Sequence, residues 1–207
     1  MCELAMEHFT ELMGTPVGRD HSLKLEALEL PAIQAEHLEV ALSEDEIWEV
    51  IRRLRPDKAP GPDGFSARFY QTCWPLIKDA VMRIVSAFDT ADGRGFARVN
   101  SAYIMLLPKK EGAVEVGDFR PISLIHSFAK IVSKAMAARL ANTLPSLVDR
   151  NQSAFVKGRS IQDNFFMVQK SIRVLYQHKA PAILLKLDVA KAFDSVAWPF
   201  ILEVLRH

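Results

Sequence analysis

The sequence predicts an α+β fold, mostly helical, with a small antiparallel sheet. Three observations support this prediction. In several segments apolar residues recur at helical spacing, which is typical of amphipathic helices. A short apolar run at Ala102–Leu107, followed by a polar connection at 109–117 that contains two glycines, indicates a pair of antiparallel strands. A compact apolar run at Ile183–Leu187, interrupted only by Lys186, is typical of a buried strand.

The clearest helix signal begins at Ser43, which precedes Glu46 by three positions in the capping-box pattern. Apolar residues then follow at helical spacing: Ile47, Val50, Ile51 and Leu54. Pro56 cannot continue a helix, so we expect this one to span about 43–55. The loop 59–64, rich in proline and glycine, separates it from the next helix.

The remaining helices are predicted from the same periodicity. They are a mostly helical stretch at 65–91 interrupted near Trp74-Pro75, a helix capped by Ser127, a helix at 161–177 and a helix from Trp198 to His207. In the second of these, the predicted inner face holds Phe128, Ile131, Ala135 and Ala138. Its predicted outer surface is basic and holds Lys130, Lys134 and Arg139, which suits either contact with phosphates or a solvated face.

Composition excludes several classes of protein. The 207 residues are 49% hydrophobic and 25% charged, which is ordinary for a soluble globular protein. The longest apolar runs are too short to cross a bilayer, and acidic residues near the N-terminus do not suit a signal peptide. Cys2 and Cys73 are the only cysteines, so no disulfide framework or zinc site is predicted.

Charge is distributed unevenly along the chain. Residues 1–50 contain two basic and twelve acidic residues, whereas residues 102–160 contain nine basic and four acidic residues. Such asymmetry indicates a polyanion-binding region, with a solvated basic surface as the alternative.

Asp188 directly follows the predicted strand at 183–187. A carboxylate at a strand end can hold a hard cation, and Mg²⁺ often takes one or two protein carboxylates together with phosphates and water. A turn or helix cap is the alternative role for an isolated aspartate there. Asp194 lies six residues later and need not share the same metal ion. His126 and His178 have no partner at catalytic spacing, and we interpret both as incidental.

Four sequence blocks occur in a recognisable order. They are Lys58–Gly64 (KAPGPDG), Leu106–Lys110 with Phe119–Leu124 (LLPKK and FRPISL), Gln152–Val156 with Gly158–Ile161 (QSAFV and GRSI), and Leu187–Val196 (LDVAKAFDSV) followed by Trp198. Together they resemble the reverse transcriptase domain of non-LTR (long interspersed element type) retrotransposons. A single short motif would match by chance, but four in the family's order are specific.

The resemblance implies a right-hand polymerase, with mostly helical fingers and the start of a palm that carries the first catalytic aspartate. Asp188 is implied to be catalytic and to bind Mg²⁺, with the Val189 carbonyl as a further metal ligand. Phe193 would lie under the incoming sugar and disfavour a 2′-hydroxyl, which distinguishes ribonucleotides from deoxyribonucleotides. A plain core aromatic is the alternative reading of Phe193.

The resemblance also implies roles for basic residues. Lys109 and Arg120 would bind the dNTP triphosphate, a task that suits the permanent charge and planar fork of arginine. Lys110 is adjacent, and either lysine could face the nucleotide. Contacts with nucleic acid are implied for Lys110, Gln152, Phe155 and Arg159. For Arg159 a surface salt bridge is the alternative.

The expected partners are an RNA template, a DNA primer and dNTPs, with no membrane, and the family implies the nucleus and cytoplasm. We expect three parts: an acidic lead-in at 1–42, an N-terminal extension and fingers at 43–180, and a truncated palm at 181–207. The chain contains no Asp-Asp dipeptide, which the family's palm supplies, and no thumb. The first hypothesis is therefore a polymerase fragment that is inactive alone. The alternatives are a non-enzymatic nucleic-acid-binding module and a retrotransposon remnant.

Overall fold

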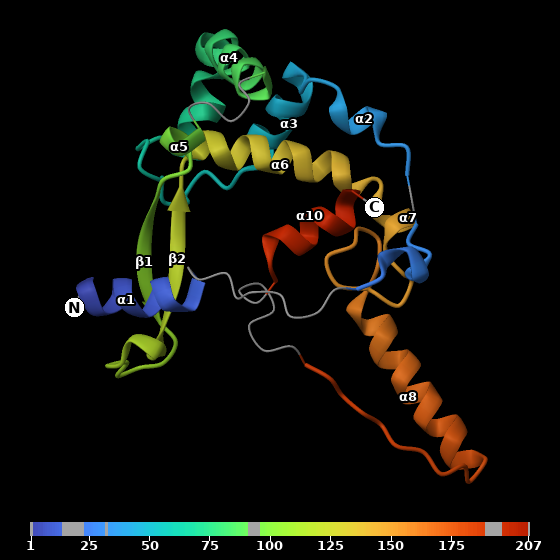
Figure 1. Cartoon of the computed structure of the whole chain (residues 1–207). Helices are drawn as coiled ribbons and strands as arrows, with labels where there is room; N and C mark the ends of the chain where they lie inside the picture. Colours follow the sequence, from blue (N-terminus) through green and yellow to red (C-terminus); the bar gives the residue numbers. More distant parts are fainter. Residues whose placement is uncertain (1, 14–22, 32, 91–95, 189–195, 207) are drawn as a thin grey trace. The chain divides into compact units, whose positions relative to one another are not determined.

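The computed structural model describes residues 2–13, 23–31, 33–90, 96–188 and 196–206 (Figure 1). Contacts divide the chain into two compact units, one of residues 35–142 and one of residues 1–34 together with 143–207. The predicted α+β fold is confirmed, because helices dominate and the strands that are described form a two-stranded antiparallel sheet.

The unit of residues 35–142 contains most of the regular structure. Its elements in chain order are α2 (Glu36–Glu39), α3 (Glu44–Arg53), α4 (Ala67–Thr90), α5 (Phe96–Val99), β1 (Ala102–Pro108), the 3-10 turn η2 (Val116–Asp118), β2 (Phe119–Ile125) and α6 (Ser127–Ala141). Helices α3, α4 and α6 pack together and provide its hydrophobic core.

Helix α3 begins at the predicted capping box. The Glu46 amide donates to the Ser43 hydroxyl at 3.3 Å, and the Ser43 amide donates to the Glu46 carboxylate at 2.9 Å. At the other end, the Gln71 side-chain amide donates to the Ile51 and Leu54 carbonyls at 3.0 and 2.9 Å. Carbonyls of the last helical turn lack partners within a helix, so Gln71 of α4 satisfies them.

Helix α4 runs without interruption through Pro75, so the predicted break near Trp74-Pro75 is wrong. A proline inside a helix removes one hydrogen bond and costs about 3 kcal/mol. Tyr70 and Trp74 on one side of Pro75, and Val81 and Val85 on the other, are all buried in the same core. Burial of this continuous apolar stripe outweighs the local penalty.

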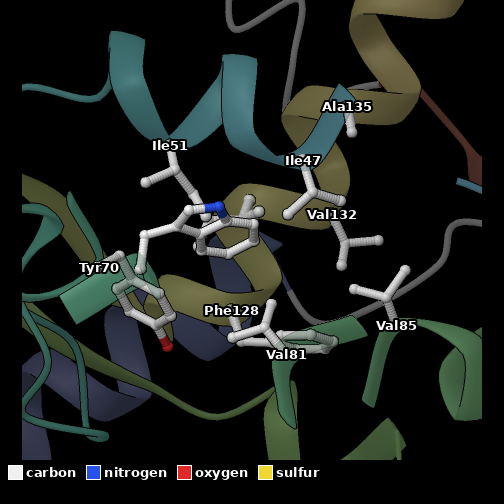
Figure 2. Close-up of a cluster of buried hydrophobic side chains, with 10 residues drawn as sticks. Ile47, Ile51, Tyr70, Val81, Val85, Phe128, Val132 and Ala135 are labelled. Atoms are coloured by element: carbon white, nitrogen blue, oxygen red, sulfur yellow. The ribbon is translucent and has the colours of Figure 1, made fainter. Parts of the chain in front are cut away.

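The core combines side chains from three helices. Figure 2 shows Ile47 and Ile51 of α3 close to Val132 and Ala135 of α6, with Val81 and Val85 of α4 beside them. Ile47, Ile51 and Ile131 have no exposed surface. The indole rings of Trp48 and Trp74 stack with their centroids 5.4 Å apart at the edge of this cluster. The periodicity used to predict α3 and α6 therefore identified the inward faces, except that Ala138 is exposed.

Helix α6 begins at Ser127, so its N-cap lies one residue earlier than predicted. His126 occupies the N-cap position without a side-chain capping bond, and Ser127 is the first helical residue. The Ser127 amide instead donates to the Asp63 carboxylate at 2.7 Å. The prediction that Ser127 caps the helix is therefore wrong, because a carboxylate from a loop distant in sequence supplies the acceptor.

Strands β1 and β2 form the predicted hairpin. Ala102 pairs with Ile125 at its base, and Pro108 pairs with Phe119 near its tip. The apolar side chains of β1 remain exposed, including Tyr103 at 60% and Ile104 at 55%. The two faces of the hairpin are thus largely uncovered, and the hairpin meets the helices of its own unit at its base.

The unit of residues 1–34 and 143–207 is mostly helical. Its elements are α1 (Cys2–Met13), the 3-10 turn η1 (Leu25–Leu28), α7 (Leu144–Leu147), α8 (Ile161–Gln177) and α10 (Trp198–Arg206). The predicted helix at 161–177 is confirmed at both ends, with Ser160 as its N-cap. The predicted helix from Trp198 is confirmed through Arg206. No helix in the described ranges is long and apolar enough to cross a bilayer.

The segment Ile183–Leu187 has no regular structure, so the predicted buried strand is wrong. Its apolar side chains are exposed, with Ile183 at 96% and Leu187 at 82%. A strand needs a neighbour to pair with its amides and carbonyls, and the strands of the described chain pair with each other instead.

Candidate functional site

The hairpin tip brings together the predicted triphosphate-binding residues. The Lys109 amide donates to the Asp118 carbonyl at 2.8 Å, which extends the strand pairing into the turn. The Lys109 ammonium donates to the Gly117 carbonyl at 2.6 Å, whereas the Lys110 ammonium lies 2.7 Å from the Asp118 carboxylate. The Lys110 hydrogen bond lowers the pKa of Asp118, so this carboxylate stays charged and offsets the charge of Lys110.

This geometry distinguishes the two neighbouring lysines. Lys110 has a carboxylate partner, and no carboxylate in the described chain lies within ion-pair distance of Lys109. An ammonium group has three donor hydrogens, and the Gly117 carbonyl occupies one. Lys109 therefore keeps an uncompensated charge and free donors, so it is better suited than Lys110 to contact a phosphate.

Arg120 lies on the same hairpin. It pairs with Leu107 across the strands, two residues before Lys109, and its side chain is exposed. In the described ranges no ion pair or hydrogen bond engages its guanidinium. A guanidinium can bind two oxygens of a phosphate at once. Arg120 and Lys109 thus provide two uncompensated positive charges near the tip of the hairpin.

The loop of residues 56–66, called here the Pro/Gly loop, is attached to the base of this hairpin. A Cβ at Gly61 would lie 2.2 Å from the Ile125 carbonyl oxygen, so only glycine fits there without displacing backbone. Asp63 accepts the Phe65 amide with one carboxylate oxygen at 3.3 Å and the Ser127 amide with the other at 2.7 Å. The Ser127 hydroxyl donates to the Phe65 carbonyl at 2.6 Å.

His126 joins the same cluster, although no sequence motif singled it out. Its Nε2 lies 2.9 Å from the Ser101 hydroxyl, and its Nδ1 lies 3.7 Å from the Asp63 carboxylate. The prediction that His126 is incidental is therefore wrong for its structural role. The missed signal is its position immediately after a strand and before a helix, where backbone groups need partners. Burial, with a smaller contribution from Asp63, raises the pKa of nearby Tyr70 to about 12.

Arg159 folds back on the loop between α7 and α8. Its guanidinium donates to main-chain carbonyls of Asp149 at 2.5 Å, Gln152 at 2.7 Å and Val148 at 3.0 Å. These partners are main-chain carbonyls and not carboxylates, so the alternative prediction of a surface salt bridge is wrong for Arg159. Its predicted contact with nucleic acid stays a prediction, and the geometry adds a role in holding this loop.

Phe155 is presented by the loop that Arg159 holds. It is 93% exposed and has a φ of 64°, in the left-handed region that a bulky residue rarely adopts. Its neighbours Ser153 and Val156 are buried, so the loop is anchored on both sides of it. The Gln152 side-chain amide donates to the Ala154 carbonyl at 3.2 Å. An exposed aromatic with Lys157 two residues away is suited to base stacking, which remains a prediction for Phe155 and Gln152.

The basic outer surface predicted for α6 is smaller than expected. Arg139 does not lie free on that surface, because its side chain is 14% exposed and its guanidinium donates to the Glu46 carboxylate at 2.5 and 2.7 Å. It also donates to the carbonyls of Val40 and Ala41. Lys134 is exposed and Lys130 is half-buried. The hydrogen bond from Arg139 lowers the pKa of Glu46 to about 2.

Asp188 ends the exposed segment that follows α8, and its carboxylate is exposed. Val189 and Phe193 lie outside the described residues, as does Asp194. In the described ranges no three histidine, cysteine, aspartate or glutamate residues gather closely enough to hold a metal ion. Among the described residues Asp188 therefore offers one carboxylate ligand, and the other oxygen ligands that a divalent ion takes would have to come from groups outside them.

Comparison with known proteins gives a consistent result. Residues 107–207 match the family described as reverse transcriptase (RNA-dependent DNA polymerase). The chain is 31% identical over 83% of its length to an uncharacterized 149 kDa protein of transposon TX1 from Xenopus laevis, of which it covers 13%. It is 28% identical over 80% of its length to a retrovirus-related Pol polyprotein from a type-1 retrotransposable element R2 of Nasonia vitripennis, covering 15% of it. It is 27% identical over 76% of its length to an RNA-directed DNA polymerase from the mobile element jockey of Drosophila funebris, covering 18% of it.

Proposed function

Because residues 107–207 belong to the reverse transcriptase family and most of the chain is related to proteins of non-LTR retrotransposons, we propose that the chain forms the fingers and the start of the palm of an RNA-directed DNA polymerase. The chain spans less than a fifth of the length of these relatives. The polymerase activity, its substrates and its partners are therefore proposed for the whole protein of which such a region is a part.

The observation that carries this proposal is the hairpin with Lys109 and Arg120. Both side chains keep an uncompensated positive charge near the tip of the paired strands, while Lys110 is neutralised by Asp118. Phosphoryl transfer depends on positioning a triphosphate and offsetting its charge. In this proposal Lys109 and Arg120 bind the triphosphate of an incoming dNTP. Lys110 supports the hairpin turn and contacts nucleic acid at the edge of the hairpin.

Other roles follow from the family. Asp188 and the Val189 carbonyl are proposed to hold a divalent ion, for which we propose Mg²⁺, and Phe193 is proposed to exclude the 2′-hydroxyl of a ribonucleotide. Bound to carboxylates and a nucleotide, such an ion would stabilise charge on the transferring phosphoryl group. Template contacts are proposed for Gln152, Phe155 and Arg159, and the polymerase would act on an RNA template and a DNA primer in the nucleus and cytoplasm.

The activity of this chain alone is tested by primer extension. Asp188 stands on an exposed, unpaired segment, so its carboxylate is not held where a nucleotide could be positioned against it. We expect the 207-residue chain to give no template-dependent extension with Mg²⁺ and dNTPs. Extension above a variant with Asp188→Asn would contradict this expectation.

Binding of nucleic acid tests the second candidate, a non-enzymatic binding module. The observation that favours it is the exposed Phe155 beside basic residues, since base stacking and phosphate contacts suffice for such binding. We expect affinity for single-stranded RNA to fall with salt and to fall further in a Lys109→Gln, Arg120→Gln variant. The matched control is Arg53→Gln, which removes an exposed charge already paired with Glu49. Salt-independent binding would contradict a phosphate-directed interface.

A further inference from the structure

The orientation of the β1–β2 hairpin depends on its base. Both faces of the hairpin are largely exposed, so packing against its faces does not hold it in one direction. At the base, Ser101 precedes β1 and His126 follows β2, and their side chains lie 2.9 Å apart. Among the residues that the structure describes in this unit, the groups that meet at this junction are the ones placed to orient the strands.

The Pro/Gly loop supplies those groups. Asp63 accepts the Ser127 amide at 2.7 Å, the first amide of α6, where a helix attracts negative charge. Its carboxylate also lies 3.7 Å from His126, and both side chains are nearly buried, at 12% and 15% exposure. The hydrogen bond from the Ser127 hydroxyl to the Phe65 carbonyl closes the attachment from the other side.

Steric fit adds a second restraint. A Cβ at Gly61 would overlap the carbonyl group of Ile125, the last residue of β2, so there is no room for a side chain. Gly64 has a φ of 70° and donates its amide to the Gly61 carbonyl at 3.0 Å, which forms the turn that presents Asp63. The ring of Phe65 stacks on that of Phe69 in α4, with the ring centroids 4.6 Å apart, so the loop is also fixed to the helical core.

From these contacts we infer that Asp63 is a positioning residue: through Ser127 and His126 it locks the base of the β1–β2 hairpin and thereby fixes where Arg120 and Lys109 point. This inference rests on the proposed function, in which these two residues bind a triphosphate. The Pro/Gly loop thus acts on the nucleotide site through the hairpin, and Asp63 itself contacts no substrate in this role.

The test measures the direction of the hairpin in the whole 207-residue chain. Spin labels at Glu111→Cys on the hairpin tip and Arg83→Cys on α4, with Cys2 and Cys73 replaced by serine, report their distance distribution by pulsed electron paramagnetic resonance. We expect a narrow distribution in the parent, a distribution at least twofold broader with Asp63→Ala, and a narrow one with Asp63→Asn, whose amide oxygen can still accept the Ser127 amide.

Two controls separate positioning from general loss of stability. Asp57→Ala removes a carboxylate from the same loop that pairs only with exposed Arg68, and should leave the distribution narrow. Ser127→Ala removes the tether to the Phe65 carbonyl but not the Asp63 contact, and should broaden the distribution moderately. If Asp63→Ala does not fold, His126→Ala decides the matter, because it removes the side chain that connects Asp63 to Ser101 at the start of β1. A parent-like width in the folded Asp63→Ala protein, or in His126→Ala where it must decide, would overturn the inference.

A nucleotide titration distinguishes failure of the inference from failure of the proposed function. Without spin labels, dTTP should bind about tenfold more weakly to Arg120→Ala and about threefold more weakly to Asp63→Ala, and the double variant should bind less than about thirtyfold more weakly because part of the Asp63 effect acts through Arg120. Unchanged affinity in Arg120→Ala would refute the triphosphate role, while the distance distributions would still decide whether Asp63 locks the hairpin. Additive losses of dTTP affinity in the double variant would refute the claim that Asp63 acts through Arg120.

Discussion

The core of α3, α4 and α6 and the stretch from α8 to Asp188 are both rich in apolar residues, yet they differ completely in burial. Ile47, Ile51 and Ile131 of the core have no exposed surface, whereas Ile172 of α8 is 49% exposed and Ile183 is 96% exposed. No residue of α8 is buried. Apolar periodicity therefore predicts that a segment is helical, but burial depends on whether partner faces lie within the same unit.

The energetic consequence follows from this difference. An isolated helix of the length of α8 is marginally stable in water, because nucleation is costly and most helical stability in proteins comes from packing. Helices α3, α4 and α6 support one another through buried side chains, through the Gln71 amide and through Arg139. We expect the two regions to respond differently to the same kind of substitution.

The largest difference is expected for isoleucine-to-alanine changes. Ile131→Ala should lower the free energy of unfolding by about 4 kcal/mol, because it removes buried methyl groups and leaves a cavity. Ile172→Ala should change it by less than about 0.5 kcal/mol, since alanine suits a helix and little burial is lost. Urea unfolding followed by circular dichroism measures both. Equal effects would show that α8 is as well packed as the core.

A glycine pair tests how tightly the Pro/Gly loop is fixed to the unit that contains the core. Gly61→Ala should cost about 3 kcal/mol, because its Cβ would lie 2.2 Å from a backbone oxygen and the backbone must shift. Gly117→Ala is the matched control, since nothing lies within 4 Å of its Cβ. Thermal unfolding of the two variants gives the comparison. A stable Gly61→Ala protein would contradict the close approach of this loop to β2.

The ion pair between Glu46 and Arg139 should make the stability of this unit sensitive to acid. The hydrogen bond from Arg139 lowers the pKa of Glu46 from 4.5 to about 2 in the folded protein. The charged carboxylate therefore stabilises the fold fully above about pH 4.5, and this contribution is lost as the pH falls through about 2. Because Glu46 is about a third exposed, we expect about 1–2 kcal/mol after screening by solvent.

Comparison with Glu46→Gln isolates that contribution. Unfolding free energies of parent and variant should differ by a constant amount between pH 5 and 7, and the difference should shrink as pH decreases toward 2. A difference that stays constant down to pH 2 would show that the charge of Glu46 contributes nothing.

The smallest effect is expected at Pro75. Pro75→Ala restores an amide that can bond the Gln71 carbonyl, and should raise stability by about 1 kcal/mol because the rest of α4 already accommodates the proline. Chemical denaturation is again the measurement, and Leu76→Ala on the exposed side of α4 is the control. A loss of stability would indicate that the proline ring itself is packed in a required position.

Local signals in the sequence predicted much of the fold. The capping box at Ser43 and Glu46, the inward faces of α3 and α6, the hairpin, and both ends of α8 are all present as predicted. Each of these depends on residues a few positions apart. The paired lysines could also be located from sequence, but the choice between them required the Asp118 carboxylate in the folded turn.

The failures share a physical cause, which is dependence on residues far away in the sequence. Asp63, 64 positions before Ser127, supplies the partner for the first amide of α6. Burial on both sides of Pro75 keeps α4 continuous, and the absence of a pairing neighbour in the described chain leaves 183–187 without strand structure. The ligand environment of Asp188 likewise depends on groups that the local motif does not specify.

Hydrogen–deuterium exchange of the whole chain, measured by mass spectrometry, tests the contrast between the two regions most directly. We predict slow exchange for peptides from α3, α4 and α6, limited by global unfolding, and exchange at least a hundredfold faster throughout α8 and the segment leading to Asp188. Protection of α8 and residues 183–188 equal to that of the three-helix core would contradict the account, because it would show that this stretch is packed within the chain.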